Sequence, residues 1–310
     1  MKFGFFTDSH FRDDTPKSRI DDIWQAQMNK LDEINEIAKD NELDFMIEGG
    51  DFFNTKKPSH KLVRAIIRWA NQLPCPLLGI IGNHDVTGYN LDSSAQSGIG
   101  VLFESGVMKR LDLIEDVNEK VVIKAVHVNA HAEQNYGDDY MFDEKYKDWK
   151  RIIISHNYII PEDSMPFGFV HPKDIKTNAH LVLCGHYHTP FNYTTKTTAW
   201  INSGPICRWA INEAGHKPNV VIVSIEDGFI GTKSILLESA KRDVFDLESV
   251  EDEKKHKLNL DAFANSLEQT SFSNVNIESL VKETGDQQRL PMESIELILE
   301  KIKEAREVLN

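Results

Sequence analysis

The stretch Leu77-Leu78-Gly79-Ile80-Ile81-Gly82-Asn83-His84-Asp85 sets an apolar run directly before an amide, an imidazole and a carboxylate. A short apolar run bounded by a turn signal is typical of a strand buried in a sheet. Six further runs have a similar length, most of them rich in β-branched residues, and we expect all seven to be strands. The six are Phe3 to Phe6, Phe45 to Ile47, Val121 to Val128, Ile152 to Ile154, Leu181 to Cys184 and Val220 to Ile225.

Two helical patterns lie between the first three expected strands. Residues 17 to 40 carry apolar side chains at three-and-four spacing, from Ile20 to Ala38, and Ser59 is a suitable N-cap for a second helix. Strands that alternate with helices at first, and dominate later, favour an α/β fold with helices covering a central sheet. We therefore predict a layered α/β sandwich over residues 1–240.

The composition changes near residue 241. The chain becomes charged and rich in Ser and Asn, and Glu251 to Lys257 is almost wholly charged. We expect residues 241–310 to form a small C-terminal cap or tail. An apolar stripe from Met292 to Leu309 fits equally well a final helix packed on its own domain and one that docks on another protein.

The 310 residues are 40% hydrophobic and 27% charged, which fits a globular protein and excludes collagen-like and mostly disordered classes. No apolar run approaches the roughly twenty residues that a membrane span needs, and Met1 to Phe6 meets Asp8 too soon for a signal peptide. We expect a cytoplasmic protein without membrane association. Its three cysteines lack zinc-finger spacing and are expected to be reduced packing residues.

The charge balance bears on the kind of partner. The chain has 35 Lys and Arg against 49 Asp and Glu, a net charge of −14. Proteins that bind nucleic acid by their own surface usually present a basic face. If the substrate is a polyanion, bound metal ions or a partner protein must therefore supply positive charge.

Polar clusters follow five of the seven apolar runs. Loops beyond the carboxyl ends of strands in an open α/β sheet gather in one crevice, so five segments could bring their side chains together. In extended backbone Asp8 and His10 would point to the same side, and His186 and His188 would do likewise. The clusters are Asp8-Ser9-His10, Gly49-Gly50-Asp51, Gly82-Asn83-His84-Asp85, His156-Asn157 and Gly185-His186-Tyr187-His188.

These residue types suit a divalent-metal centre. Imidazoles, carboxylates and one amide form a donor set accepted by manganese, iron or zinc, unlike the oxygen shell of calcium. Asp51, next to two glycines that allow close backbone approach, is the natural bridging carboxylate between two ions. Two divalent ions would also change the net charge from −14 to −10 (−14 + 4). Each motif alone is more often a solvated loop, a turn or a core histidine, but their joint occurrence favours a metal site.

In order and spacing, the five clusters resemble the calcineurin-like metallophosphoesterases over residues 1–240. The resemblance implies that His84 contacts the scissile phosphate or protonates the leaving oxygen, and that Asp85 orients the His84 ring. It implies two metal sites, one held by Asp8, His10, Asp51 and His188 and the other by Asp51, Asn83, His156 and His186.

A second, narrower resemblance is carried by the stretch from Asn202 to Arg208, together with Glu213 and Arg242 further along the chain. This stretch is similar to the end of the phosphoesterase domain in the SbcD-type nucleases, the nuclease subunits of a double-strand-break repair complex. It implies an Mn²⁺-dependent exonuclease and endonuclease acting at DNA ends, a homodimer, and an SbcC-type coiled-coil, SMC-like ATPase partner bound by the C-terminal helix. Arg208 would be a substrate-side contact.

Two departures from that family pattern are visible: a short C-terminal region, which suggests a compact form, and Asn54, which is expected to lie behind the metal ligands. Only about seventy residues follow position 241, and Asn54 stands where relatives often have an acidic residue. Two alternatives stay open from the residues alone. The same core could serve a phosphatase or cyclic-nucleotide phosphodiesterase, or the chain could act mainly as a scaffolding subunit of an ATPase complex.

Overall fold

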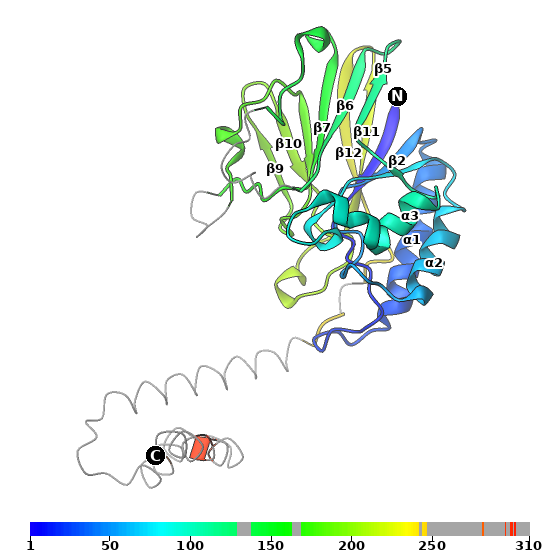
Figure 1. Ribbon diagram of the computed structural model, residues 1–310, viewed down its shortest axis with the longest axis vertical. Coiled ribbons are helices and arrows are strands. Elements are labelled where there is room, and N and C mark those ends of the chain that lie inside the picture. Colours follow the sequence, from blue (N-terminus) through cyan, green and yellow to red (C-terminus); the bar gives the residue numbers. More distant parts are fainter. Residues whose placement is uncertain are drawn as a thin grey trace, which may run out of the picture. The chain divides into compact units, whose positions relative to one another are not determined.

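The structure is a computed structural model that describes residues 1–128, 138–162, 169–241 and 244–246, together with residues 281, 295, 298, 299 and 301 (Figure 1). The chain divides into two compact units, Met1–Phe245 and Asp246–Asn310. The helix and cap expected after residue 241 lie almost wholly outside the described residues. The description below concerns the first unit.

Two mixed sheets of six strands form the centre of this unit. The first, in the order β12-β11-β1-β2-β3-β4, consists of β1 (Lys2–Phe6), β2 (Phe45–Glu48), β3 (Leu77–Gly79), β4 (Lys109–Arg110), β11 (Asn219–Glu226) and β12 (Phe229–Leu236). The second, in the order β5-β6-β7-β8-β10-β9, consists of β5 (Leu113–Asp116), β6 (Val121–Val126), β7 (Lys150–Ser155), β8 (Leu181–Cys184), β9 (Phe191–Thr194) and β10 (Ala199–Asn202).

All seven predicted strands are confirmed, as β1, β2, β3, β6, β7, β8 and β11. The other five strands were not predicted. Among these, β5, β9 and β12 expose much of their length, so polar residues interrupt their apolar pattern. The sequence signal for a strand is therefore strongest where both of its faces are buried.

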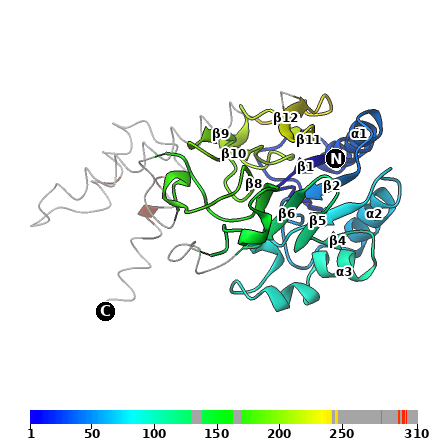
Figure 2. The same cartoon turned by 90° about the horizontal axis from the view of Figure 1, so that it is seen from above.

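The sheets pack face to face, and their inner faces form one apolar core that includes Phe5 and Val223 from the first sheet and Ile123 and Ile154 from the second. The helices α1 (Ile23–Asp40) and α2 (His60–Ala70) cover the outer face of the first sheet, and the short α3 (Gly98–Glu104) lies near α2 (Figures 1 and 2). The predicted α/β sandwich of sheets flanked by helices is confirmed.

The N-terminal ends of the two long helices are set by their N-cap residues. The Ser59 side chain accepts a hydrogen bond from the Leu62 backbone at 3.1 Å, which confirms Ser59 as the N-cap of α2. The first helix begins later than predicted, because Asp22 caps it. Ile20 lies before the helix and is 64% exposed. Short 3-10 helices occupy Asn83–Asp85, Leu91–Gln96, Glu144–Tyr146, Pro172–Asp174 and Ile211–Glu213.

The polar loops leave both sheets at the same edge of the sandwich. Strands β1, β2 and β3 are parallel neighbours in the first sheet, and β7 and β8 are parallel neighbours in the second. The sandwich was predicted, and the structure adds how its polar loops are divided between the two sheets. Three polar loops come from the first sheet and two from the second, so face-to-face packing is what brings them together.

Candidate metal centre

Four residues of the polar loops have left-handed backbone. Their φ angles are 51° at Asp8, 44° at His10, 58° at Asp51 and 77° at His186. The expectation that Asp8 and His10 share one side of an extended strand is therefore wrong. Left-handed backbone at a non-glycine residue costs on the order of 1–3 kcal/mol and concentrates at functional sites. The tight turns, rather than strand geometry, aim these side chains inward.

Glycine is required beside these turns. A Cβ on Gly82 would lie 2.2 Å from Asp51 Oδ1, and a Cβ on Gly50, whose φ is +99°, would lie 2.4 Å from His156 Nδ1. Contacts this short are sterically excluded. Gly82 thus allows two loops of the first sheet to touch at backbone distance, and Gly50 allows a loop of the first sheet to approach His156, which follows β7 of the second sheet.

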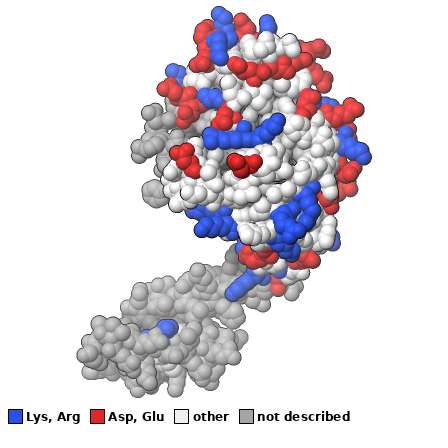
Figure 3. All heavy atoms as spheres, turned by 45° about the vertical axis from the view of Figure 1, so that its right-hand side comes forward, with Lys and Arg blue, Asp and Glu red and all other residues white. Residues whose placement is uncertain are grey.

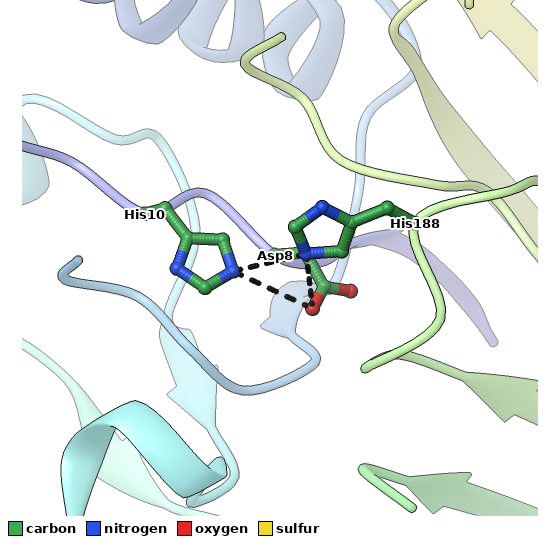
Figure 4. Close-up of side chains that lie close together, drawn as sticks. All are labelled: Asp8, His10 and His188. Atoms are coloured by element: carbon green, nitrogen blue, oxygen red, sulfur yellow. Dashed lines mark hydrogen bonds and ion pairs between the residues drawn. The ribbon is translucent and has the colours of Figure 1, made fainter. Parts of the chain in front are cut away.

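One donor group consists of Asp8, His10 and His188 (Figure 4). Figure 4 shows the three side chains converging from the loop after β1 and the loop after β8. Asp8 Oδ1 lies 3.6 Å from His188 Nε2 and 3.9 Å from His10 Nε2, and the two imidazole nitrogens are 3.1 Å apart. The backbone N–H of His186 donates to Asp8 at 3.0 Å, which joins the loops of the two sheets directly.

A second donor group consists of Asp51, His156 and His186. His156 Nε2 lies 3.3 Å from Asp51 Oδ2. The same Asp51 oxygen is 3.7 Å from His10 Nε2, in the first group. Asp51 therefore lies between the two groups, as a bridging carboxylate must.

The residues present fit divalent cations. Asn83 Oδ1 is buried and accepts no hydrogen bond from any residue that the structure describes. An unsatisfied buried acceptor costs about 1–3 kcal/mol, and a cation held beside it would remove that cost. Carboxylate, imidazole and amide donors together match the borderline metals manganese, iron and zinc.

Three imidazole rings are oriented through Nδ1. His156 Nδ1 lies 2.7 Å from the Gly49 carbonyl oxygen, and His84 Nδ1 lies 2.8 Å from the Asn54 carbonyl oxygen. His188 Nδ1 lies 2.5 Å from Glu213 Oε1. Since a carbonyl can only accept, Nδ1 carries the proton in His156 and His84, which directs Nε2 of His156 to the cluster.

Sequence reasoning placed Asn54 behind the metal ligands without predicting its contact with His84, and it did not identify Gly49 or Glu213 as orienting partners. Gly49 and Asn54 act through backbone carbonyls, which leave no trace in the side-chain sequence. Glu213 was noted only within a family motif, and it lies far from His188 in sequence.

Burial and neighbouring charge set the protonation of the cluster. Burial lowers the pKa of His10 and of His186 to about 3, so both imidazoles are neutral, the form that binds a metal. Burial also acts to lower the pKa of His156, but the Asp51 and Asp8 carboxylates outweigh it and raise the pKa to about 10. His156 therefore carries a proton that a cation would have to displace.

The role predicted for Asp85 is wrong in one respect. Its carboxylate does not orient the His84 ring, which is held by the Asn54 carbonyl. Asp85 instead accepts from the backbone N–H of Gly82 at 2.9 Å and of Asp51 at 3.2 Å. Burial, together with the nearby Asp51, raises the pKa of Asp85 to about 8. This side chain braces the turn that carries Asn83 and His84.

Arg208 was predicted as a substrate-side contact, and the structure shows its side chain bonded inside the fold. Arg208 is 4% exposed, and its guanidinium donates to the backbone carbonyls of Ala214, at 3.0 Å, and of Lys241. These contacts direct the charged group into the fold, because burying it requires paired acceptors. These contacts give Arg208 a structural role in the fold.

Residues 1–190 match the family model described as Calcineurin-like phosphoesterase. The chain belongs to this family. With the donor groups described above, membership makes this phosphoesterase a metal-dependent hydrolase. The resemblance inferred from the five polar clusters is confirmed.

Two characterised relatives are nuclease or break-repair proteins. This phosphoesterase is 22% identical over 256 residues to the SbcD subunit of the nuclease SbcCD from Bacillus subtilis, a match covering 69% of this chain and 65% of the relative. It is 27% identical over 199 residues to the DNA double-strand break repair protein Mre11 of Thermoplasma acidophilum, covering 59% of this chain and 50% of the relative. The phosphoesterase thus matches between half and two thirds of the length of these proteins.

Among solved structures, the phosphoesterase is similar to a dimetal phosphatase from Danio rerio. The TM-score is 0.49 at 10% sequence identity, and the match covers 76% of this chain and 98% of that one. In the described part of the chain, no helix is both long and apolar enough to cross a membrane.

Proposed function

We propose that this phosphoesterase is an Mn²⁺-dependent DNA nuclease subunit that acts as exonuclease and endonuclease at DNA ends in recombination and repair. The observation that carries the proposal is the pair of donor groups that adjoin at Asp51. The two relatives named for nuclease and break-repair activity support DNA as the substrate.

The residues divide between two proposed metal sites. Asp8, His10, Asp51 and His188 would hold one ion, and Asp51, Asn83, His156 and His186 the other. Two divalent ions there would supply Lewis-acid polarisation of a phosphoryl oxygen and would acidify an attacking water. The protein holds the neutral imidazoles of His10 and His186, and the Asp51 carboxylate, in place for them before substrate arrives.

His84 is the proposed catalytic acid. Its ring packs edge-on against the His10 ring, with centroids 4.6 Å apart, which places it beside the first donor group. Because Nδ1 is bonded to the Asn54 carbonyl, Nε2 is the nitrogen left to contact a phosphate oxygen or to pass a proton to the leaving oxygen. Asp85 supports this indirectly by holding the turn.

The charge distribution is consistent with a need for ions and a partner. On the face shown in Figure 3, groups of Lys and Arg stand among groups of Asp and Glu. We infer that DNA binding depends on the two ions and on an SbcC-type, SMC-like ATPase. In this proposal residues 292–309 grip the ATPase, the phosphoesterase is a homodimer, and the complex works in the cytoplasm on nucleoid DNA.

The test is cleavage of linear duplex and single-stranded DNA by the full chain with Mn²⁺. We expect His84→Ala to abolish cleavage while Mn²⁺ remains bound, because His84 is proposed to act on the substrate and not to hold an ion. The exposed His60 provides a control, and His60→Ala should cleave normally.

Other outcomes would redirect the proposal. Turnover of a cyclic nucleotide or a phosphoprotein without DNA cleavage would make the protein a phosphodiesterase or phosphatase of the same fold. Capture of the ATPase with no hydrolysis of any phosphoester would make it a scaffolding subunit. Full DNA cleavage by His84→Ala would remove His84 from the mechanism.

A further inference from the structure

The segment Cys207–Glu213 connects one donor group to the place where the chain leaves the first unit. We propose that this segment is a brace in which Glu213 positions His188, and Arg208, bonded to the carbonyl of the neighbouring Ala214, ties the segment to the chain exit, formed by Lys241, Val244 and Phe245. The proposal rests on the metal-site function proposed above. It predicts that changes at the chain exit affect one metal site and spare the other.

Glu213 is placed to hold His188 rigidly. Its carboxylate is 6% exposed, and Oε1 lies 2.5 Å from His188 Nδ1. The other oxygen, Oε2, accepts from the backbone N–H of Trp209 and of Ala210. Both oxygens are therefore bonded, and the position of the His188 ring depends on the backbone of the segment.

Trp209 extends the brace to the loop after β1. Its indole Nε1 donates to the Ser9 carbonyl at 3.2 Å, and Ser9 lies between Asp8 and His10. The Arg12 guanidinium lies 5.6 Å from the centre of the Trp209 ring. All three members of the first donor group thus rest on the brace, either directly or through a neighbour in sequence.

Two members of the second donor group, His156 and Asp51, have supports outside the brace. His156 is held by the Gly49 carbonyl, and Asp51 Oδ1 accepts from the backbone N–H of His84 at 2.7 Å. Within the described ranges, neither His156 nor Asp51 has a hydrogen bond to the brace. The third member, His186, donates its backbone N–H to Asp8 at 3.0 Å, which joins the two groups. The brace itself bonds to the first group through His188 and through the Ser9 carbonyl between Asp8 and His10.

Two buried arginines join the brace to the chain exit. Arg208 donates to the Lys241 carbonyl, and Arg19 donates to the Arg208 carbonyl while its guanidinium lies 5.4 Å from the Phe245 ring centre. The Ile20 N–H donates to the Val244 carbonyl at 3.1 Å. The second unit begins at Asp246, directly after these contacts. A partner acting on that unit could thereby change the affinity for one ion.

The experiment is calorimetric titration of the metal-free full chain with Mn²⁺, supported by electron paramagnetic resonance of the bound ion. We expect two equivalents in the wild-type chain. Glu213→Ala should weaken one equivalent by about 10-fold to 100-fold, as loss of an outer partner does at metal sites, and Glu213→Gln, which keeps an acceptor for His188, by less. Arg208→Met should weaken the same equivalent.

Arg151 is the matched control. It also donates to backbone carbonyls, those of Asn178 at 2.7 Å and Tyr146 at 2.8 Å, but on the second sheet and away from the brace. Arg151→Met should leave both equivalents unchanged. Circular dichroism and thermal unfolding establish that each variant is folded. If Arg208→Met does not fold, Arg208→Lys is used in its place.

The outcomes separate the brace from the proposed function. Equal weakening of both equivalents in the Arg208 variant, or weakening of neither, would overturn the brace. A wild-type chain that takes up no Mn²⁺ would instead overturn the proposed function on which it rests.

Discussion

Asp8 Oδ1 and His188 Nε2 lie 3.6 Å apart although they follow strands of different sheets, β1 and β8. The contact exists because the two sheets pack face to face and their polar loops leave at one edge. A local change in either sheet is therefore expected to alter the positions of the donor side chains at the metal centre. The following predictions use this relationship.

Asp51→Asn should remove the carboxylate that lies between the two donor groups. Both proposed metal sites lose charge, so DNA cleavage should fall by more than about 100-fold, the upper end of what loss of a merely outer partner costs a metal site. Calorimetry should show fewer than two Mn²⁺ bound. Two equivalents of unchanged affinity would contradict a bridging role for Asp51.

Asp85→Ala and Asp85→Asn should differ in stability. Alanine leaves the backbone N–H groups of Gly82 and Asp51 without their acceptor, at a cost of about 1–3 kcal/mol. Because the pKa of Asp85 is raised to about 8, the carboxyl is protonated at neutral pH and asparagine is close to its shape and charge. Denaturant unfolding measures the free energy of unfolding of both variants. Equal destabilisation by alanine and asparagine would count against the bracing role of Asp85.

Gly82→Ala should destabilise the protein and weaken Mn²⁺ binding. The added Cβ would lie 2.2 Å from Asp51 Oδ1 and 2.4 Å from Asp51 N, so the turn must move, at about 1–3 kcal/mol. Gly215 is the matched control, since a Cβ there meets nothing within 4 Å. Unfolding midpoints of the two variants test the difference, and a Gly82→Ala variant as stable as Gly215→Ala would disprove the close approach.

The stability of the metal-free protein should fall as pH rises from 7 to 9. The pKa of His156 is raised from 6.5 to about 10 and that of Asp85 from 3.8 to about 8. Over this range the folded state therefore binds more protons than the unfolded state, and the free energy of unfolding decreases with pH. The neutral His10 and His186 titrate below this range. Thermal melts measure the slope, and Asp85→Asn should reduce it between pH 7 and 8.

Mn²⁺ affinity should change with pH in the opposite direction. Binding at the second donor group displaces the proton of His156, so affinity should rise from pH 7 toward pH 9, by at most about 10-fold per pH unit for one released proton. Calorimetry in buffers of different ionisation enthalpy measures the proton released. Affinity that is independent of pH would show that His156 is not a ligand.

Some of this site could be predicted from residues close together in the chain. Apolar runs indicate the seven buried strands, and Ser59 marks the start of α2 because a cap is a local interaction. Exposed strands such as β12 were not predicted because only burial imposes an apolar pattern. The polar residues directly after the strands were identified because they adjoin the apolar runs in the sequence.

Other features could not be predicted from short stretches of sequence because they depend on contacts between residues far apart in the chain. The left-handed turns at Asp8 and His10, the partition of the loops between two sheets, and the inward direction of Arg208 follow from packing. The His84 ring is bonded to the Asn54 carbonyl, while the Asp85 carboxylate accepts from the backbone of Gly82 and Asp51.

The amino-acid sequence alone determined which side chains are available: the carboxylates, imidazoles and amide that suit a borderline metal, and the strands that precede them. Only the tertiary structure decided how those donors are grouped around Asp51 and which groups orient them. The reason is physical. Donor chemistry and strand burial are properties of single residues and short runs, whereas distances between loops depend on how two sheets pack against each other.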